Sequence, residues 1–456
     1  MNSQVFRKYD IRGIFPADLD EDLTTKLGMA LGELAGNTVA IGRDCRPSGS
    51  ILSSWLTDGI LISGSDVIDL GVQTTPMTYY AAHTLNPDVT VMITGSHNPP
   101  EYNGFKIMYG HKTIWGEGIH SLQNTMENTK TATLAAPVAT VIKKSIAKPY
   151  ANRLLSEFCF DRSLKIAVDA GNGTGGEIAV DVLRNLGCRV IPLYCEMDGY
   201  FPNHHPDPTV EENLKDLRST VLRERADIGI AFDGDADRIG ILDEKGNVIW
   251  GDRVLIILAK SLLKANPGAT IISEVKASGL FFSEIERAGG HAVMSPTGHS
   301  LIKKAMYEEN ALLAGEMSGH IFFRDRYYGY DDALYAALRL IEIISSNDAP
   351  LSSYLADLPE VFSTAEIREE CSDESKFIIV DIVTDMLKKA GYPVDTTDGA
   401  RISFPDGWGL IRASNTQPVL VMRFEAGTHQ QLTDYENIMC DYIEKAGRKM
   451  DVKTAD

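Results

Sequence analysis

The feature that most constrains the fold is a pattern of short apolar strands alternating with amphipathic helices, which recurs three times up to about residue 345. The expected strands are 38–41, 66–70 and 89–96, then 164–168, 189–193 and 227–232, then 270–272 and 311–314. Such strands, separated by helices of ten or more residues, predict parallel sheets covered by helices. We therefore expect an α/β fold with three tandem domains whose sheets are mixed but largely parallel.

The C-terminal region follows a different pattern. It predicts a helix around 376–390, paired strands at 402–404 and 419–424, and a final helix to about 447, which together indicate an α+β domain. A looser segment at 131–137 indicates the approach to a domain boundary. The expected domains are 1–146, 147–248, 249–360 and 361–456.

The composition is that of an ordinary globular protein. Apolar residues make up 44% of the 456 residues and charged residues 23%. The net charge of −19 argues against nucleic acid or an anionic membrane as a partner. No apolar run approaches the roughly 20 residues that span a bilayer, and the N-terminus does not resemble a signal peptide, so we expect a cytoplasmic protein. Six scattered cysteines fit a reducing compartment and indicate neither a zinc site nor a disulfide framework.

A lone serine follows the apolar run 89–93, in Thr94-Gly95-Ser96-His97-Asn98-Pro99-Pro100. Ligand sites in open α/β sheets commonly lie where strands end and the chain turns. By itself the motif fits either a functional hydroxyl or a plain polar turn, and Ser96 is its candidate functional residue.

Three aspartates alternate with small residues in Asp233-Gly234-Asp235-Ala236-Asp237-Arg238. They could surround one hard cation, or they could form a solvated acidic turn. A calcium-binding helix–loop–helix is excluded, because its sixth position needs glycine where this chain has Arg238, and because strands flank this loop. Mg²⁺ fits better, since it takes few protein carboxylates together with phosphate oxygens.

Two further loops carry groups that suit a sugar phosphate. Gly315-Glu316-Met317-Ser318-Gly319-His320 offers a carboxylate, a hydroxyl and an imidazole for sugar hydroxyls. Arg412-Ala413-Ser414-Asn415-Thr416, with Arg423 downstream, offers a phosphate clamp. A structural histidine and a capped turn are the alternatives for these two loops.

Together the four loops resemble the α-D-phosphohexomutases, in particular the bacterial phosphomannomutase/phosphoglucomutase branch of that family. The resemblance covers nearly the whole chain, with the motifs in the family's order. The further matching segments are Lys8-Tyr9-Asp10-Ile11-Arg12-Gly13, Asn103-Gly104-Phe105-Lys106, Pro202 to Pro208, Asp252-Arg253, Lys276 and Thr297-Gly298-His299-Ser300.

The resemblance implies four domains around a central cleft and a resting enzyme phosphorylated on Ser96. It implies Mg²⁺ held by Ser96, Asp233, Asp235 and Asp237. The phosphoryl group would pass to a hexose phosphate, giving a hexose 1,6-bisphosphate that serves as intermediate and activator. Its other phosphate would then return to the serine, so that phosphate moves between C1 and C6 of mannose or glucose. The implied partners are hexose phosphates alone, and we expect a monomer.

The resemblance also implies roles for individual residues. The catalytic residues are Ser96, Arg12, Lys106, Arg238 and His320. The substrate-binding residues are Tyr9, Arg253, Lys276, Gly298, His299, Glu316, Met317, Ser318, Gly319, His320, Arg412, Ala413, Ser414, Asn415 and Thr416. Glu316 and Ser318 are expected to bind sugar O3 and O4 and to ignore O2, which would admit both epimers.

Several points stay open on the sequence alone. Ala236 stands where the family usually has glycine, and it costs on the order of 1 kcal/mol if the position requires a positive φ. Met317 differs from the glutamine typical of phosphoglucosamine mutases, which are one alternative. A metal-dependent sugar phosphatase and a non-enzymatic sugar-phosphate binder are the others. For Arg43 and Arg46 the alternative to ligand contact is an interdomain ion pair. His204 and His205 are expected to shape a proline-rich loop.

Overall fold

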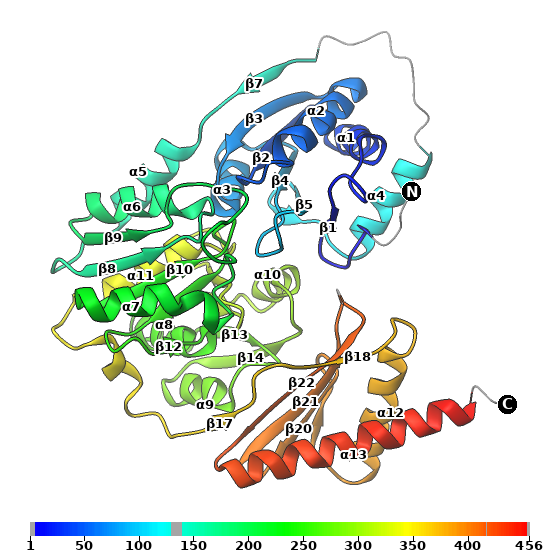
Figure 1. The fold of residues 1–456 in the computed structure, drawn as a ribbon, viewed down its shortest axis with the longest axis vertical. Helices are drawn as coiled ribbons and strands as arrows, with labels where there is room; N and C mark the ends of the chain where they lie inside the picture. Colours follow the sequence, from blue (N-terminus) through cyan, green and yellow to red (C-terminus); the bar gives the residue numbers. More distant parts are fainter. Residues whose placement is uncertain (1–4, 129–138, 416, 454–456) are drawn as a thin grey trace. The chain divides into compact units, whose positions relative to one another are not determined.

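The computed structural model describes residues 5–128, 139–415 and 417–453, and it divides into two compact units (Figure 1). One unit comprises Met1–Ser261 with Ser318–Tyr354, and the other comprises Leu262–Met317 with Leu355–Asp456. The chain therefore passes between the units three times, and one of the crossings falls between Met317 and Ser318. The boundary segment expected at 131–137 lies outside the described residues.

The first sheet has the strand order β1-β5-β4-β2-β3-β7, with β6 paired to β5. Strands β2, β3, β4 and β7 pair in parallel, whereas β5 is antiparallel to β1, β4 and β6. Its strands are β1 (Ile11–Ile14), β2 (Thr38–Arg43), β3 (Asp66–Val72), β4 (Val89–Ile93), β5 (Tyr102–Tyr109), β6 (Lys112–Thr113) and β7 (Val141–Lys143). Its helices are α1 (Glu21–Ala35), α2 (Gly49–Ser63), α3 (Thr75–Leu85) and α4 (Glu117–Asn128).

Helices α1 and α2 pack against each other through two glycines. A Cβ added to Gly28 would lie 2.2 Å from the Leu56 carbonyl oxygen, and one added to Gly59 would lie 2.1 Å from that of Thr25. Only glycine permits so close an approach of two helix backbones. The apolar faces of both helices join the buried strand residues in one hydrophobic core.

The second sheet has the order β12-β11-β10-β8-β9. The central pairs β8–β9 and β8–β10 are parallel, and β10, β11 and β12 form antiparallel pairs at one edge. Its strands are β8 (Lys165–Asp169), β9 (Arg189–Leu193), β10 (Ile228–Phe232), β11 (Ile239–Leu242) and β12 (Val248–Ile249). The associated helices are α5 (Ala147–Glu157), α6 (Gly175–Asn185), the 3₁₀ helix at Glu211–Leu214 and α7 (Lys215–Glu224).

The first unit also contains α11 (Ala333–Ser345), which packs on β11 and on the short strand β16 (Ile321–Phe323). The division between units passes through α8 (Gly251–Ala265). A 3₁₀ helix lies at Leu351–Leu355.

The second unit contains two sheets. In one, β13 (Thr270–Glu274) lies between β14 (His291–Ser295) and β15 (Leu313–Gly315), with both pairs parallel, and the helices are α9 (Gly279–Arg287) and α10 (His299–Glu308). The other sheet is wholly antiparallel, in the order β17-β22-β21-β20-β19, with β18 also paired to β22. Its elements are β17 (Phe362–Ser363), β18 (Ile367–Glu370), α12 (Lys376–Lys389), β19 (Val394–Asp395), β20 (Ala400–Phe404), β21 (Gly407–Ala413), β22 (Val419–Ala426) and α13 (His429–Lys453).

These elements confirm the expected mixed α/β fold with an α+β C-terminal region. Two predictions were wrong: the strand expected at 89–96 ends at Ile93, before the turn that carries Ser96, and the strands expected at 402–404 and 419–424 do not pair with each other. Strand β21 lies between β20 and β22 and pairs with both. Its start, Gly407-Trp408-Gly409, has the glycine content of a turn, yet the backbone of Gly407 approaches that of Glu425 so closely that a Cβ would lie 2.0 Å from its carbonyl oxygen.

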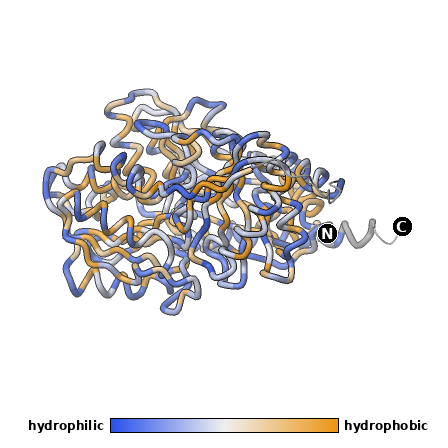
Figure 2. The backbone as a smooth tube through the Cα atoms, turned by 90° about the horizontal axis from the view of Figure 1, so that it is seen from above, coloured by the Kyte–Doolittle hydropathy of each residue, from blue (hydrophilic) through white to orange (hydrophobic). Residues whose placement is uncertain are grey.

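Apolar and polar stretches alternate along the coloured part of the backbone trace in Figure 2. Within the described residues, no helix combines the length and the apolar character needed to cross a membrane. All six cysteines are free thiols.

Candidate active site

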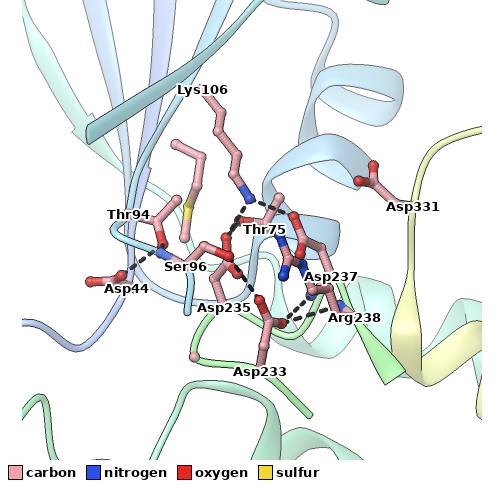
Figure 3. Close-up of polar contacts among 12 residues, drawn as sticks. Asp44, Thr75, Thr94, Ser96, Lys106, Asp233, Asp235, Asp237, Arg238 and Asp331 are labelled. Carbon is pink, nitrogen blue, oxygen red and sulfur yellow. Dashed lines mark hydrogen bonds and ion pairs between the residues drawn. The ribbon is translucent and has the colours of Figure 1, made fainter. Parts of the chain in front are cut away.

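Ser96 lies in a strained turn after β4. Its φ of 49° falls in the left-handed region, which residues other than glycine seldom adopt. Its side chain is buried, and its Oγ donates a hydrogen bond of 2.8 Å to Asp233 Oδ2 (Figure 3). Strain of this kind persists only where the surroundings enforce it, and it is concentrated at functional sites. The turn therefore presents one hydroxyl to the acidic loop.

The three aspartates of the acidic loop converge between β10 and β11. All three are fully buried, and one oxygen of each lies within 4.8 Å of the others. Asp233 Oδ1 accepts hydrogen bonds from the backbone N–H groups of Asp237 and Arg238, both at 3.1 Å, which close the loop around the carboxylates. Ala236 has a φ of 60°, so the position does require the left-handed conformation and the alanine is strained there.

Burial and charge shift the pKa values of this cluster in opposite directions. Burial, together with the charges of Asp235 and Asp237, raises the pKa of Asp233 well above its usual value. Burial acts the same way on Asp235, but Lys106 and the Thr75 hydroxyl outweigh it and lower that pKa. Lys106 Nζ donates to Asp235 Oδ2 at 2.7 Å and also contacts Asp237 Oδ2. Burial alone would lower the pKa of Lys106, yet these two carboxylates raise it well above its usual value.

The donor set fits a hard divalent cation. Oδ1 of Asp235 and Oδ1 of Asp237 are buried and accept no hydrogen bond from the described residues. Buried carboxylate oxygens without donors are costly, and a cation with oxygen ligands would satisfy them. The raised pKa of Asp233 reflects the same excess of negative charge. Asp233, Asp235 and Asp237 are thus the residues that would hold a metal ion.

Arg238 and His320 extend the cluster on the side of Asp237. Arg238 Nε donates to His320 Nε2 at 3.0 Å. His320 Nδ1 lies 3.1 Å from Asp331 Oδ2 and 3.5 Å from Asp237 Oδ1. Burial lowers the pKa of His320, but the charge of Asp237 and the hydrogen bond to Asp331 outweigh it and raise that pKa. Since Nδ1 faces carboxylates, the neutral ring carries its proton there and leaves the Nε2 lone pair facing Arg238.

The N-terminal motif lies in the same unit. Arg12 is on β1, and its Nη2 donates to Asp10 Oδ2 at 2.6 Å. Burial, then the charges of Arg238 and Arg12, lower the pKa of His97, which keeps that imidazole neutral beside Ser96. The hydroxyl of Ser96 lies 3.3 Å from His97 Nδ1.

Four other predicted residues of this unit are placed by their elements. Tyr9 precedes β1, and Arg253 lies in the first turn of α8, both half-buried. Ser318 and Gly319 precede His320, and the Gly319 carbonyl accepts from the Ile239 N–H at 3.0 Å. Gly319 has a φ of 90°, and a Cβ there would lie 2.3 Å from the Ile239 carbonyl oxygen.

Lys276 is a buried lysine of the second unit. Its Nζ lies 3.1 Å from Glu366 Oε1 and 3.5 Å from Glu274 Oε2. Burial lowers the pKa of Lys276, but the charges of Glu274 and Glu366 outweigh it and raise that pKa. Burial would raise the pKa of Glu366, yet Lys276 and Arg368 lower it to about 2.

The predicted sugar-binding residues of this unit adjoin the same carboxylates. Glu274 Oε1 accepts from the Met317 N–H at 3.0 Å. Glu316 Oε1 accepts from the Gly298 N–H at 2.8 Å. Gly298 has a φ of 127°, and it directly precedes His299, the first residue of α10.

Arg412 lies near the end of β21 and is held by a carboxylate. Its Nε donates to Asp398 Oδ2 at 2.9 Å, and the Thr297 N–H donates to the same oxygen at 3.0 Å. The buried guanidinium therefore already binds an anionic group in this structure.

The rest of the predicted phosphate clamp follows β21. Ala413 is its last strand residue, and the Ser414 hydroxyl oxygen accepts from the Gln417 N–H at 3.2 Å. Asn415 comes next, and Thr416 lies outside the described residues.

Two arginines and a histidine outside the four loops have carboxylate partners. For Arg43 and Arg46 the sequence left interdomain ion pairs open; among the described residues, Arg43 pairs with Asp69 and Arg46 with Asp44, both within the first sheet and its loops. His204 Nε2 lies 3.1 Å from both oxygens of Asp169, so it braces the proline-rich loop as expected.

Sequence reasoning missed several supporting residues. Thr75, at the start of α3, donates its hydroxyl to Asp235 Oδ2 at 2.5 Å and its N–H to the Asp235 carbonyl at 2.9 Å. Asp331 faces His320, and Asp44 accepts from Thr94 Oγ1 and the Gly95 N–H. Of these three residues, only Asp44 could have been noticed in the sequence, because it lies in the charged run Gly42-Arg43-Asp44-Cys45-Arg46. Thr75 and Asp331 belong to no recognisable motif.

Comparisons with known proteins agree with this geometry. Family models described as phosphoglucomutase/phosphomannomutase α/β/α domains I, II and III match residues 3–132, 148–246 and 250–362, and the C-terminal domain model matches 366–441.

Individual relatives cover almost the whole chain. A phosphomannomutase/phosphoglucomutase of Pseudomonas aeruginosa is 43% identical over 99% of this chain and 97% of its own length. A phosphoglucomutase of Neisseria gonorrhoeae is 44% identical over 95% of each chain. The crystal structure of a phosphoglucomutase/phosphomannomutase family protein from Burkholderia thailandensis superposes with a TM-score of 0.91 at 38% identity over 98% of each chain. The chain belongs to the phosphoglucomutase/phosphomannomutase family of isomerases.

Proposed function

We propose that this enzyme moves a phosphoryl group between C1 and C6 of glucose and mannose phosphates through a phosphorylated Ser96. The observation that carries the proposal is the 2.8 Å hydrogen bond from Ser96 Oγ to Asp233 Oδ2, inside a cluster of three buried aspartates and a buried lysine. A binder of sugar phosphates has no need for a strained serine that faces buried carboxylates, so this arrangement favours phosphoryl transfer.

In the first half-reaction, a free hydroxyl of the hexose phosphate attacks phosphorus. The bond between phosphorus and Ser96 Oγ breaks as the new ester forms, and the serine oxygen takes up a proton. Arg12, Lys106 and His320 are the groups assigned to holding the sugar hydroxyl in line and exchanging its proton. Mg²⁺, when bound by the three aspartates and the phosphoserine, would neutralise charge on the transferring phosphoryl oxygens. Arg238 supplies a second positive charge there.

The product of that step is a hexose 1,6-bisphosphate. It turns over within the site, and its other phosphate returns to Ser96 in the second half-reaction, so the net change is a shift of phosphate between C1 and C6. A trace of the bisphosphate therefore activates any enzyme molecule that has lost its phosphate.

The non-reacting phosphate and the sugar ring are assigned to other loops. Arg412, Ser414, Asn415 and Thr416 would bind the phosphate, with the carboxylate on Arg412 marking an anion position. Glu316 and Ser318 would bind O3 and O4, which glucose and mannose share in configuration. The remaining residues proposed to contact substrate are Tyr9, Arg253, Lys276, Gly298, His299, Met317, Gly319 and Ala413. A monomer and a cytoplasmic location stay predictions.

A coupled assay tests the proposal. Glucose 1-phosphate, mannose 1-phosphate and glucosamine 1-phosphate are supplied in parallel, with Mg²⁺ and a trace of hexose 1,6-bisphosphate, and Ser96→Ala is the control. We expect comparable turnover of the first two sugars, lost in the variant by a factor of about 10⁴ or more. Release of inorganic phosphate without isomerisation would instead indicate a phosphatase, and activity on glucosamine 1-phosphate alone would indicate a phosphoglucosamine mutase. The named relatives favour neither of these two alternatives.

A further inference from the structure

The guanidinium of Arg46 donates five hydrogen bonds close to the nucleophile, and the proposed chemistry assigns this side chain no role. It follows β2 and is 2% exposed. Its guanidinium Nη2 donates to the carbonyl oxygens of Ser96 at 2.8 Å and of Asn98 at 2.6 Å. Nη1 donates to the carbonyl oxygens of Pro99 at 2.5 Å and of Tyr102 at 3.1 Å. One side chain therefore binds three carbonyl groups of the serine turn and the carbonyl group of Tyr102, the first residue of β5.

Asp44 completes this arrangement. Its Oδ2 accepts from Arg46 Nε at 3.1 Å, from the Thr94 hydroxyl at 2.7 Å and from the Gly95 N–H at 3.1 Å. The Thr94 hydroxyl oxygen in turn accepts from the Ser96 N–H at 2.8 Å. Ser96 is thereby held on both sides of its Cα, at its N–H through Thr94 and at its carbonyl through Arg46.

The chemistry of the side chain explains why it is arginine. All five guanidinium N–H groups donate, in a rigid planar fork, and every acceptor is a main-chain carbonyl or Asp44. A lysine ammonium has three donors at one point and cannot reach the same carbonyls. Turn carbonyls without strand partners are costly to bury, so a buried turn of this shape depends on such a donor.

The fit around the guanidinium leaves no room for adjustment. A Cβ on Gly95 would lie 2.5 Å from Arg46 Cζ. The ring of Phe201 lies on the guanidinium with its centroid 5.1 Å from Cζ, and this residue belongs to the loop after β9. The serine turn therefore packs against Arg46, and the other side of the guanidinium packs against Phe201, in the loop after β9.

We propose that Arg46 is a positioning residue for the phosphoserine, which holds Ser96 in its left-handed conformation so that the phosphoryl group is transferred to the sugar and not to water. This inference rests on the proposed function, since it needs phosphate on Ser96. Without the clamp, Ser96 relaxes toward a negative φ and its Oγ leaves Asp233. Misplacement of a reacting group by about 1 Å costs on the order of 10²-fold in rate.

The same relaxation exposes the phosphoserine to hydrolysis. A water oxygen attacks phosphorus, the bond from phosphorus to Ser96 Oγ breaks, Oγ takes the proton released by water, and inorganic phosphate leaves. Every such event inactivates the enzyme until hexose 1,6-bisphosphate phosphorylates it again. Loss of Arg46 thus predicts a slower mutase, more phosphate released per isomerisation, and a stronger need for the bisphosphate.

The test compares Arg46→Met and Arg46→Lys with Arg339→Met, all in the full-length chain with Mg²⁺. Arg339 is a matched control, since it is 7% exposed, pairs with Asp325 at 2.8 Å and lies over the ring of Phe323, away from the serine turn. Both Arg46 variants are expected to lose about 10²-fold in kcat for glucose 1-phosphate with KM changed less than about threefold. Their ratio of released phosphate to isomerised sugar is expected to rise at least tenfold. Arg339→Met is expected to lose thermal stability with no change in that ratio.

Two further measurements distinguish a failure of the proposed function from a failure of the inference about Arg46. Intact mass of the purified wild-type chain reports phosphate on Ser96, and a wild type with neither phosphate nor mutase activity would overturn the proposed function itself. Where Arg46→Met does not fold, Asp44→Asn replaces it, because the amide cannot accept all of the bonds that the carboxylate holds. A phosphorylated, active wild type whose Arg46 or Asp44 variants keep its kcat and its phosphate ratio would overturn the inference alone.

Discussion

Two buried lysines, one in each compact unit, are each held by two carboxylates, but the two clusters differ in burial and in distance. Lys106 lies within 2.7 Å of Asp235 Oδ2 and contacts Asp237 as well, and both acids are fully buried. Lys276 lies 3.1 and 3.5 Å from Glu366 and Glu274, at longer distances. The side chain of Glu366 is 27% exposed.

The first arrangement is fully buried, whereas one carboxylate of the second is partly exposed. In the Lys106 cluster the carboxylates are shared among the amine, Thr75 and the predicted metal site, so removal of any group leaves a buried charge. In the second unit, Lys276 and Arg412 each hold a carboxylate that a substrate anion could replace. Preorganised charge of the first kind serves a transition state, while exchangeable ion pairs serve ground-state binding.

Substitution of each lysine by methionine tests whether the two clusters differ in function. Lys106→Met is expected to lower kcat by about 10³-fold with KM changed less than about threefold, because the proposed function assigns the amine to the reacting hydroxyl and its proton. Lys276→Met is expected to raise KM for glucose 1-phosphate by about 10- to 100-fold with a smaller effect on kcat. Steady-state kinetics measure both. Circular dichroism confirms that each variant is folded, and an equal loss of kcat in the two variants would contradict the distinction.

The second prediction concerns Asp332, a buried carboxylate whose hydrogen-bond donors are neutral rather than cationic. Asp332 accepts hydrogen bonds from the hydroxyls of Tyr150 and Tyr327 and from the Tyr335 N–H, and burial raises its pKa to about 6. Glu366, with Lys276 beside it, has its pKa lowered to about 2. Because the folded-state pKa of Asp332 lies above the unfolded value of 3.8, the folded state binds the extra proton between about pH 4 and 6. The stability that this group contributes is therefore present at the acidic end of that window and lost as pH rises through 6.

A difference of 2.2 pKa units between 6 and 3.8 corresponds to about 3 kcal/mol. Relative to Asp332→Asn, the wild-type chain is expected to lose about 2–2.5 kcal/mol of the free energy of unfolding between pH 4 and pH 7, because the unfolded state is already partly protonated at pH 4. Urea titrations of both proteins at the two pH values give the difference, and the pH dependence of all other groups cancels in the comparison. An equal gap between the two proteins at both pH values would show that Asp332 keeps its ordinary pKa.

The third prediction tests the exchangeable pair at Arg412. Arg412→Lys keeps the charge but loses the planar fork that can bind phosphate through two donors. KM for glucose 1-phosphate and mannose 1-phosphate is expected to rise by about tenfold for both sugars, with kcat nearly unchanged. A selective effect on one sugar would mean that this residue contacts the ring and not the phosphate. Lys445→Met, at an exposed i,i+4 pair in α13, is the matched control and is expected to leave both constants unchanged.

The recurrent strand–helix pattern predicted the architecture because its central strands are apolar along their whole length. Strands β4 and β10 are buried at every position, and such a continuous apolar run can be recognised as a strand without knowing which strand it pairs with. The motifs that follow these strands were predictable for the same reason, since they occupy the turns at the strand ends. Strand β21 was missed because it begins with Gly407-Trp408-Gly409, where close packing on β22 and not propensity decides the conformation.

The supporting contacts were beyond the reach of the sequence because they involve the main chain or single distant residues. Arg46 binds four carbonyl groups, and main-chain acceptors leave no mark in a sequence. Thr75 and Asp235 are 160 residues apart, and Thr75 begins α3 beside the first sheet while Asp235 lies in a loop of the second sheet. In the sequence, Asp331 and Asp332 are simply two adjacent acidic residues. In the structure, Asp331 faces His320, whereas Asp332 faces a cluster of tyrosines.

The smallest expected effect concerns Ala236, where three contributions of similar size oppose one another. Its φ of 60° costs about 1–2 kcal/mol relative to glycine. Ala236→Gly would remove that strain but would increase the freedom of the unfolded chain by about 0.5–1 kcal/mol. It would also remove a buried methyl group worth about 0.8 kcal/mol, which packs beside Gly175.

The sum lies near zero, so Ala236→Gly is expected to change the free energy of unfolding by less than about 1 kcal/mol and to leave kcat unchanged. A chemical denaturation curve and the mutase assay together check this. If Ala236→Gly raised the free energy of unfolding by more than about 2 kcal/mol, the strain at Ala236 would be larger than the cost of its positive φ alone. A fall in kcat would mean that the methyl group against Gly175 fixes the spacing of the aspartates, and alanine would then be part of how the first unit holds its charges in place.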